Sequence, residues 1–241
     1  MEIARAAAAL FVRQGLRATR AEDIAQAAGI APRTFYRYFA TKEEAVAPLY
    51  AAGAQRWIEA VRTAPADLPV PQALEHAVSQ TLTPGLGVSA ASWEWLRTLI
   101  RLADTSPALR KVWAEVCQAS EGALAEILAA REGTSGRPTS EASGPTPDPA
   151  RPSRDPARIT PDPARPGPDP ARITDPARPG PDLRFAAAVA GAAVRVAVES
   201  WAATTTLPTG PESPAALAVR NLRALRDFAW GAPGGAPGRQ G

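Results

Sequence analysis

Apolar and polar residues follow a helical period over most of the chain. At its start, Ile3, Ala7, Leu10 and Phe11 have the i, i+4, i+7, i+8 spacing of the buried stripe of an amphipathic helix. Gly15 stands where the C-cap of that helix is expected. We therefore expect the chain to open with a helix that ends at Gly15.

Two capping boxes predict where the next helices begin. In this motif a Ser or Thr hydroxyl accepts a hydrogen bond from a first-turn amide, and a Glu three residues later reaches back. The spacing is found in Thr19–Glu22 and in Thr41–Glu44. It predicts helices that begin near residues 20 and 42, the second running to about residue 63. Between them Gly29 interrupts one helix, and Pro32 suits the first turn of another.

The helical period continues beyond residue 63, with one interruption. Helices are predicted over residues 70–83, 90–104, 107–131, 183–206 and 215–230. Residues 133–181 instead hold fourteen of the twenty-six prolines and five copies of Asp-Pro-Ala-Arg, with almost no large apolar residue. Such a segment forms no continuous helix and buries too little surface to offset its ordering entropy. We predict a disordered insertion in a surface loop; a partner-binding arm is the alternative.

These elements predict an all-α fold class. Residues 1–45 would form an N-terminal three-helix domain. Residues 46–132 would form the first part of a larger helical domain, and residues 182–230 its last two helices. Residues 231–241 are a Gly/Pro-rich tail that we expect to be disordered.

Charge and rare residue types narrow the function. The net charge is only +3, but residues 1–42 carry seven Arg and Lys against three Asp and Glu, and a local positive face attracts phosphates. The single cysteine, Cys117, excludes a thiolate zinc site, and the single His76 removes most metal sites and catalytic triads. No Gly-rich phosphate loop is present either. We therefore predict a protein that is not an enzyme and has no metal or cofactor.

The chain start lacks the layout of a signal peptide, and we identify no apolar run of eighteen or more residues. The stretch Phe185–Val198 is shorter than that and contains Arg195. We therefore expect a cytoplasmic protein without a membrane span.

Residues 20–39 have the layout of a helix-turn-helix. A short helix over residues 20–28 is followed by Gly29 and by a second helix over about residues 32–39. In this motif the second helix enters the major groove and the first lies across the DNA backbone. The small inner core would comprise Ile24, Ala25, Ala28, Ile30 and Phe35. The second helix would expose Arg33, Thr34, Tyr36, Arg37 and Tyr38.

The stretch from Ala21 to Glu44 resembles the DNA-binding signature of the TetR family of transcriptional regulators over its whole length. The matching residues are Ile24, Ala25, Ala28, Gly29, Thr34, Tyr36, Phe39 and Lys42, and Leu10, Phe11 and Gly15 match the family's first helix. The resemblance implies a three-helix DNA-binding domain, a fourth helix leading to a ligand domain, and a homodimer joined through the last two helices. It also implies a palindromic double-stranded DNA operator and a small-molecule effector.

Carried over by position, the family pattern implies two kinds of DNA contact. Arginines can bond the guanine edge through two hydrogen bonds, and Arg33 and Arg37 are the candidates for base readout. Hydroxyl and ammonium groups can bond phosphates, and the resemblance implies that Thr34, Tyr36 and Lys42 do so. Tyr38 is exposed for DNA or, as the alternative, packs between the helices. Thr19 is expected to serve both as a helix cap and as a phosphate contact. The predicted DNA-binding residues are Thr19, Arg33, Thr34, Tyr36, Arg37, Tyr38 and Lys42.

All six tryptophans lie outside the DNA-binding part. In a helical domain this much aromatic area either fills a core or lines a pocket. Trp93, Arg97 and Arg101 share one helix face, which suits an anionic ligand with an apolar body; a solvated arginine edge is the alternative. The resemblance adds a hint of an acyl-CoA-like effector. The candidate ligand-binding residues are Trp57, Trp93, Arg97, Arg101, Trp113 and Trp201.

The last two predicted helices are suited to close packing. Residues 183–206 are rich in Ala and Gly, and Leu217, Asn221, Leu225 and Phe228 form one stripe of the final helix. Two such helices per subunit predict a four-helix dimer interface. The predicted function is a DNA-binding repressor that a small molecule releases from its operator. A constitutive helix-turn-helix DNA binder with no ligand is the alternative, and the residues do not support an enzyme.

Overall fold

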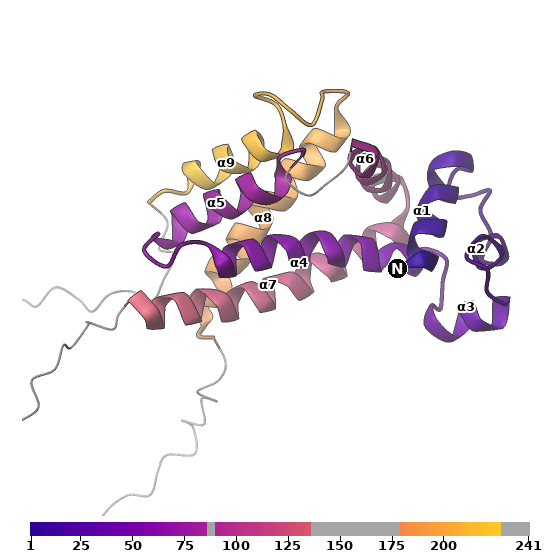
Figure 1. The fold of residues 1–241 in the computed structure, drawn as a ribbon, viewed down its shortest axis with the longest axis horizontal. Coiled ribbons are helices and arrows are strands. Elements are labelled where there is room, and N and C mark those ends of the chain that lie inside the picture. Colours follow the sequence, from indigo (N-terminus) through magenta and orange to yellow (C-terminus); the bar gives the residue numbers. More distant parts are fainter. Residues whose placement is uncertain (86–89, 136–178, 228–241) are drawn as a thin grey trace, which may run out of the picture.

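The computed structural model describes residues 1–85, 90–135 and 179–227, and these ranges contain α-helices, one short 3₁₀ helix and no strand. The predicted all-α fold class is confirmed. Figure 1 shows α1, α2 and α3 clustered at one end of the molecule, with the remaining helices forming an elongated body. The helices are α1 (Glu2–Gln14), α2 (Ala21–Ala27), α3 (Pro32–Tyr38), η1 (Glu44–Val46), α4 (Ala47–Thr63), α5 (Val70–Leu82), α6 (Ala90–Thr105), α7 (Pro107–Ser135), α8 (Pro181–Ala203) and α9 (Pro214–Ala224).

The predicted disorder of the Pro-rich insertion and of the C-terminal tail concerns residues that lie almost entirely outside the described ranges. At the insertion's edges, α7 continues to Ser135 and α8 begins at Pro181. Both helices therefore extend slightly into the range predicted as insertion. Pro181 lies in the first turn of α8, where a proline costs the helix no hydrogen bond.

Local chemistry fixes several helix ends as the sequence predicts. Gly15 ends α1 with a φ of 83°, and Gly29 follows α2 with a φ of 68°; both values are in the region that favours glycine. Pro32 occupies the first turn of α3. At α9 the Ser213 hydroxyl accepts a hydrogen bond from the Ala216 amide at 3.1 Å.

The first predicted capping box is wrong by one residue. Helix α2 begins at Ala21, and the Asp23 carboxylate, rather than that of Glu22, accepts from the Arg20 amide at 2.8 Å. The Thr19 hydroxyl instead donates to the Gly15 carbonyl at 2.9 Å. Asp and Glu both suit the first turn of a helix, so the sequence alone did not separate them.

The long helix predicted from residue 42 begins later than expected. The Thr41 hydroxyl accepts from the Glu44 amide at 3.3 Å, as in a capping box, but the Glu44 carboxylate accepts from the Ala40 amide at 2.9 Å. A short 3₁₀ helix, η1, then precedes α4. Pro48 explains the break, because its ring would clash with the carbonyl four residues earlier in a continuous α-helix.

Two hydrophobic cores divide the structure. The larger core lies among α4, α5, α6, α7, α8 and α9 and has Trp93 and Trp201 fully buried. The smaller core lies under α1–α3, and Tyr50 of α4 and Leu99 of α6 belong to it. Since α4 and α6 contribute to both cores, they connect the three N-terminal helices to the body.

The final helix faces its own chain. Leu217 is buried, Leu225 packs against the larger core, and the Asn221 side chain donates to the Ala193 carbonyl of α8 at 3.0 Å. The stripe predicted to meet a second subunit is therefore used against α8 within the chain, and Phe228 lies outside the described residues. The helix also stops at Ala224, earlier than the predicted residue 230.

Helix α8 is long and apolar enough to cross a membrane by length and composition alone. Its apolar residues have another explanation, since α8 packs against α6, α7 and α9, and 44% of its most apolar window is buried. In Figure 1 it runs diagonally behind α4 through the body. Its hydropathy is that expected of a core helix.

Candidate functional site

The helix-turn-helix forms around one buried aromatic ring. Phe35 of α3 is fully buried, as are Ile24 and Ala25 of α2. The Phe39 ring packs against Phe35 with centroids 5.5 Å apart, and Ile30 packs on the same core. Burial of this face of α3 leaves the opposite face available to solvent and DNA.

The solvent face of α3 carries the two arginines predicted to read bases. Arg33 is exposed and makes no hydrogen bond or ion pair with the part of the chain that the structure describes. Arg37 donates to the Tyr38 hydroxyl at 3.2 Å, and its guanidinium lies 5.0 Å from the centre of that ring. Tyr38 is 61% exposed, so the alternative that it packs between the helices is wrong.

Tyr36 is tied to the first helix of the motif. Its hydroxyl donates to the Glu22 carboxylate at 3.2 Å, and this hydrogen bond raises the pKa of Tyr36. The Tyr36 side chain is 51% exposed, and Thr34 beside it is half-buried. For Tyr36 to donate to a phosphate, the Glu22 carboxylate must first release it.

Two residues predicted to contact phosphates have structural roles here. Thr19 is 1% exposed, and its hydroxyl bonds to Gly15 and to the Gln14 side chain, so the prediction that it contacts a phosphate is wrong. Lys42 donates through Nζ to the carbonyl of Leu16 at 2.7 Å and to that of Thr19 at 2.8 Å. It holds the loop between α1 and α2, with one ammonium N–H left for another acceptor.

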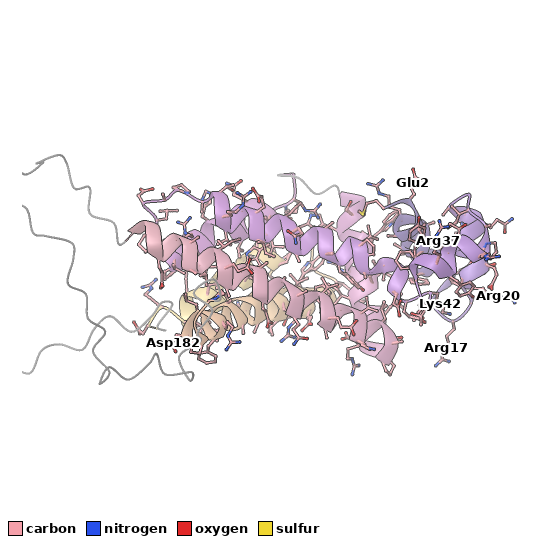
Figure 2. All side chains as sticks on the ribbon, turned by 90° about the horizontal axis from the view of Figure 1, so that it is seen from below. Glu2, Arg17, Arg20, Arg37, Lys42 and Asp182 are labelled. Atoms are coloured by element: carbon pink, nitrogen blue, oxygen red, sulfur yellow. The ribbon has the colours of Figure 1, made fainter. Side chains whose placement is uncertain are left out.

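The same loop carries two arginines that were not singled out from the sequence. Arg17 and Arg20 are both exposed. Figure 2 shows them with Arg37 and Lys42 at the end of the molecule formed by α1–α3, far from Asp182 at the other end. The excess of basic residues in residues 1–42 indicated a positive face, but it did not show which arginines lie on that face.

A cavity of about 210 Å³ lies in the body between α4, α6, α7 and α8, with the end of α5 at its wall. That exceeds the roughly 150 Å³ known to accept benzene in an apolar protein interior. Three of the predicted ligand residues, Trp57, Trp93 and Trp113, line it. Lining residues that the sequence did not identify include Tyr50, Arg56, Trp95, Cys117, Glu121 and Arg195.

Arg97, Arg101 and Trp201 do not line this cavity, so their assignment to the pocket is wrong. Arg97 is 9% exposed, donates to the Thr206 carbonyl and lies 4.2 Å from the centre of the Trp201 ring. Arg101 donates to the carbonyls of Ala202 at 2.6 Å and Thr204 at 2.8 Å. Both guanidinium groups serve the C-terminal end of α8, where unpaired carbonyls favour a positive charge.

Charged groups of the cavity lie on α7 and α8, and the exposed Arg56 of α4 also lines it. Arg195 pairs with Glu199 at 3.0 Å, and Glu199 also accepts from Trp113 Nε1 at 2.7 Å. Burial raises the pKa of the Glu121 carboxyl, an effect that Arg195 opposes. Burial also raises the pKa of the Cys117 thiol to about 12, which keeps the thiol protonated and unreactive at neutral pH.

The cavity and the core of the helix-turn-helix share residues. Tyr50 lines the cavity and belongs to the smaller core, and its hydroxyl donates to the Leu99 carbonyl of α6 at 3.1 Å. Its ring meets Trp113 edge-on at 4.9 Å. Leu99 and Trp113 likewise line the cavity and contact the smaller core. A molecule in the cavity would therefore touch side chains that support α1–α3.

The chain is similar to known transcriptional regulators. Residues 3–47 match the family of bacterial regulatory proteins, tetR family. The HTH-type transcriptional regulator TcmR of Streptomyces glaucescens is 34% identical over 137 residues, which are 55% of this chain and 59% of that protein. The HTH-type transcriptional repressor KstR2 of Mycobacterium tuberculosis is 51% identical over 45 residues, 19% of this chain and 22% of that one. The matches thus span less than two thirds of these relatives.

The whole fold has a solved counterpart. The structure of FadR from Thermus thermophilus, a TetR family transcriptional repressor in complex with lauroyl-CoA, has a TM-score of 0.53 and covers 98% of both chains. Its sequence identity is 20%, so the likeness concerns the fold alone.

The position of Lys42 leads to a prediction about stability. Lys42→Ala removes two charge-assisted hydrogen bonds from the loop between α1 and α2, so we expect the free energy of unfolding to fall by about 1–3 kcal/mol. Arg17→Ala, an exposed cation on the same loop, should change it by less than about 0.5 kcal/mol. Urea denaturation followed by circular dichroism measures both. Equal stability of Lys42→Ala and wild type would contradict this role.

Proposed function

Since the chain belongs to the TetR family of transcriptional regulators, we propose that it is a repressor whose affinity for its operator falls when a small molecule occupies the cavity. The observation that carries this proposal is the sharing of Tyr50, Leu99 and Trp113 between the cavity wall and the core of the helix-turn-helix. A constitutive DNA binder would need no such cavity. The cavity therefore favours the ligand-responsive alternative.

The proposed DNA interface is the solvent face of α3 with the loop before α2. Arg33 is positioned to read a base without losing a bond within the described chain, whereas Arg37 must leave Tyr38 to do so. Thr34, Tyr36 and Tyr38 supply hydroxyls for phosphates, and the exposed Arg17 and Arg20 add positive charge. We keep Lys42 as a phosphate contact only through the one N–H that its carbonyl bonds leave.

The proposed switch acts through α4 and α6. A ligand that pushes on Tyr50 or Leu99 moves side chains on which α1 packs, and so changes how the recognition helix is held. To reverse a 99:1 preference, the ligand must bind the released state more tightly by about 5.5 kcal/mol. That requirement suits a molecule with an apolar body, because aromatic side chains line much of the cavity.

An acyl-CoA-like effector, the hint given by the sequence, stays one candidate. The FadR neighbour was solved with lauroyl-CoA, and the cavity here can take an apolar chain. The anchors predicted for an anionic head are absent, however, because Arg97 and Arg101 are bound to the end of α8. The polar end of the effector therefore needs another partner.

We also propose a homodimer, joined through α8 rather than through the stripe predicted on α9. Helix α8 exposes Phe185 and Val196, which are 62% and 44% accessible, and Ala188 and Ala192 lie between them at helical spacing. Small residues at these positions allow two helices to approach closely. A dimer of this kind would place two recognition helices on one face of a palindromic operator, about 34–36 Å apart.

The DNA interface is tested with an operator selected from a random DNA pool. We expect Arg33→Ala or Arg37→Ala to relax preference at one base pair, at a cost of about 1–3 kcal/mol. Arg17→Ala and Arg20→Ala should instead weaken operator and unrelated DNA alike and lower the salt slope by about one unit each. Fluorescence anisotropy across a salt series measures both effects. Uniform loss for Arg33 and Arg37 as well would assign them to phosphates and place base reading elsewhere.

The switch is tested by a screen of acyl-CoAs, fatty acids, aromatic acids and amines. A compound in the cavity should change tryptophan fluorescence and lower operator affinity. It should also slow alkylation of Cys117, the single cysteine, which mass spectrometry follows at alkaline pH because the thiol is protonated at neutral pH. A compound that protects Cys117 but leaves operator affinity unchanged would contradict the switch and favour the constitutive DNA binder.

A further inference from the structure

The charged groups around the cavity are unequally paired. The Arg195 guanidinium has Glu199 as its counter-ion at 3.0 Å, and Glu199 is also held by Trp113 Nε1. The Glu121 carboxylate has no hydrogen bond or ion pair with any residue in the described ranges, although it lines the cavity. Arg56 of α4 is the remaining charged residue of the lining, and it is exposed to solvent. The half-buried charged groups are Arg195, Glu199 and Glu121, and together they leave one negative charge over.

A missing side chain on α8 makes room for Glu121. A Cβ at Gly191 would lie 3.2 Å from Glu121 Cγ, closer than such atoms normally approach. Glycine at this position lets the Glu121 side chain lie against α8 at the border of the cavity. Burial there raises the pKa of Glu121 even though Arg195 acts against the rise, as expected for a carboxylate short of positive partners.

Aromatic side chains form much of the remaining wall. Tyr50, Trp57, Trp93, Trp95 and Trp113 all line the cavity. The face of an aromatic ring attracts a cation, and aromatic cages of this composition recognise alkylated ammonium groups. An anion would meet Glu121 in the half-buried part of the wall, where the Arg195 charge is already paired with Glu199. Arg56, the other cation of the lining, is exposed, so water screens its charge.

We propose that the cavity selects an organic cation, a protonated amine on an apolar body, whose ammonium group pairs with Glu121 while the body lies among the aromatic side chains. This inference rests on the proposed function, since it names the chemical class of the effector for the same cavity. It assigns the effector a charge opposite to the one that Arg97 and Arg101 had indicated. Glu121 is then the residue that determines specificity for charge.

Three compounds with one naphthyl body and different head groups test the proposal. They are 1-naphthylmethylamine as the cation, 1-naphthylmethanol as the neutral control and 1-naphthylacetate as the anion. Calorimetry at neutral pH on the full chain should show the amine binding at least about tenfold more tightly than the alcohol, and the acetate most weakly. Amine binding should weaken as the pH falls through the raised pKa of Glu121, because protonation removes the negative charge.

The variant Glu121→Gln should remove the advantage of the amine and leave alcohol binding in place, which also shows that the variant is folded. Glu126→Gln, an exposed carboxylate on the same helix outside the cavity, is the matched control and should bind all three as wild type does. Equal binding of the three compounds, preference for the acetate, no binding at all, or an unchanged amine affinity in Glu121→Gln would overturn the proposal. Operator binding, measured in parallel, separates this result from the proposed function: an amine that binds without changing operator affinity contradicts only the switch.

Discussion

Tyr50 connects the DNA-binding helices to the cavity, because one side chain belongs to both. Its ring is buried in the core that supports α1–α3, and it also forms part of the cavity wall. A buried phenol needs an acceptor for its hydroxyl, and the Leu99 carbonyl of α6 provides one at 3.1 Å. This hydrogen bond joins α4 to α6 within the core on which α1–α3 pack. The position of the DNA-binding helices therefore depends on the cavity wall.

Helix α6 connects the smaller core to the end of α8. Through Leu99 and Ala103 it packs into the smaller core, and through Arg97 and Arg101 it holds the end of α8. The Arg97 guanidinium lies over the Trp201 ring at 4.2 Å, which helps to stabilise a charge that is almost fully buried. A shift of α8 caused by a ligand would therefore reach α6 and, through it, α1. The two arginines thus belong to the mechanical connection and not to the ligand site.

Features that depend on neighbours in the sequence could be predicted well. Gly15, Gly29 and Pro32 set the helix ends of the helix-turn-helix, and Phe35 fills its core, because each role depends on residues a few positions away. Errors at this level were small, such as Asp23 in place of Glu22. The break at Pro48 is equally local, since a proline disrupts the helix turn that precedes it.

Features that depend on distant segments could not be predicted. Arg97 and Arg101 share a helix face with Trp93 as expected, but what that face meets is the end of α8, about a hundred residues away. The same holds for Glu121, whose place beside Gly191 requires α7 and α8 to pack together across the Pro-rich segment. Lys42 was predicted as a phosphate contact because its carbonyl partners, Leu16 and Thr19, lie on an earlier loop. Tertiary contacts of this kind leave no local pattern.

A ligand in the cavity should change the stability of helices that do not line it, α1 and α3 among them. Hydrogen–deuterium exchange, with and without a compound shown to protect Cys117 from alkylation, tests this directly. We expect a saturating concentration of the compound to change the exchange rates of amides in α1 and α3, as well as those in α4 and α6. Changes confined to the cavity-lining helices, with α1–α3 exchanging as in the free protein, would contradict it.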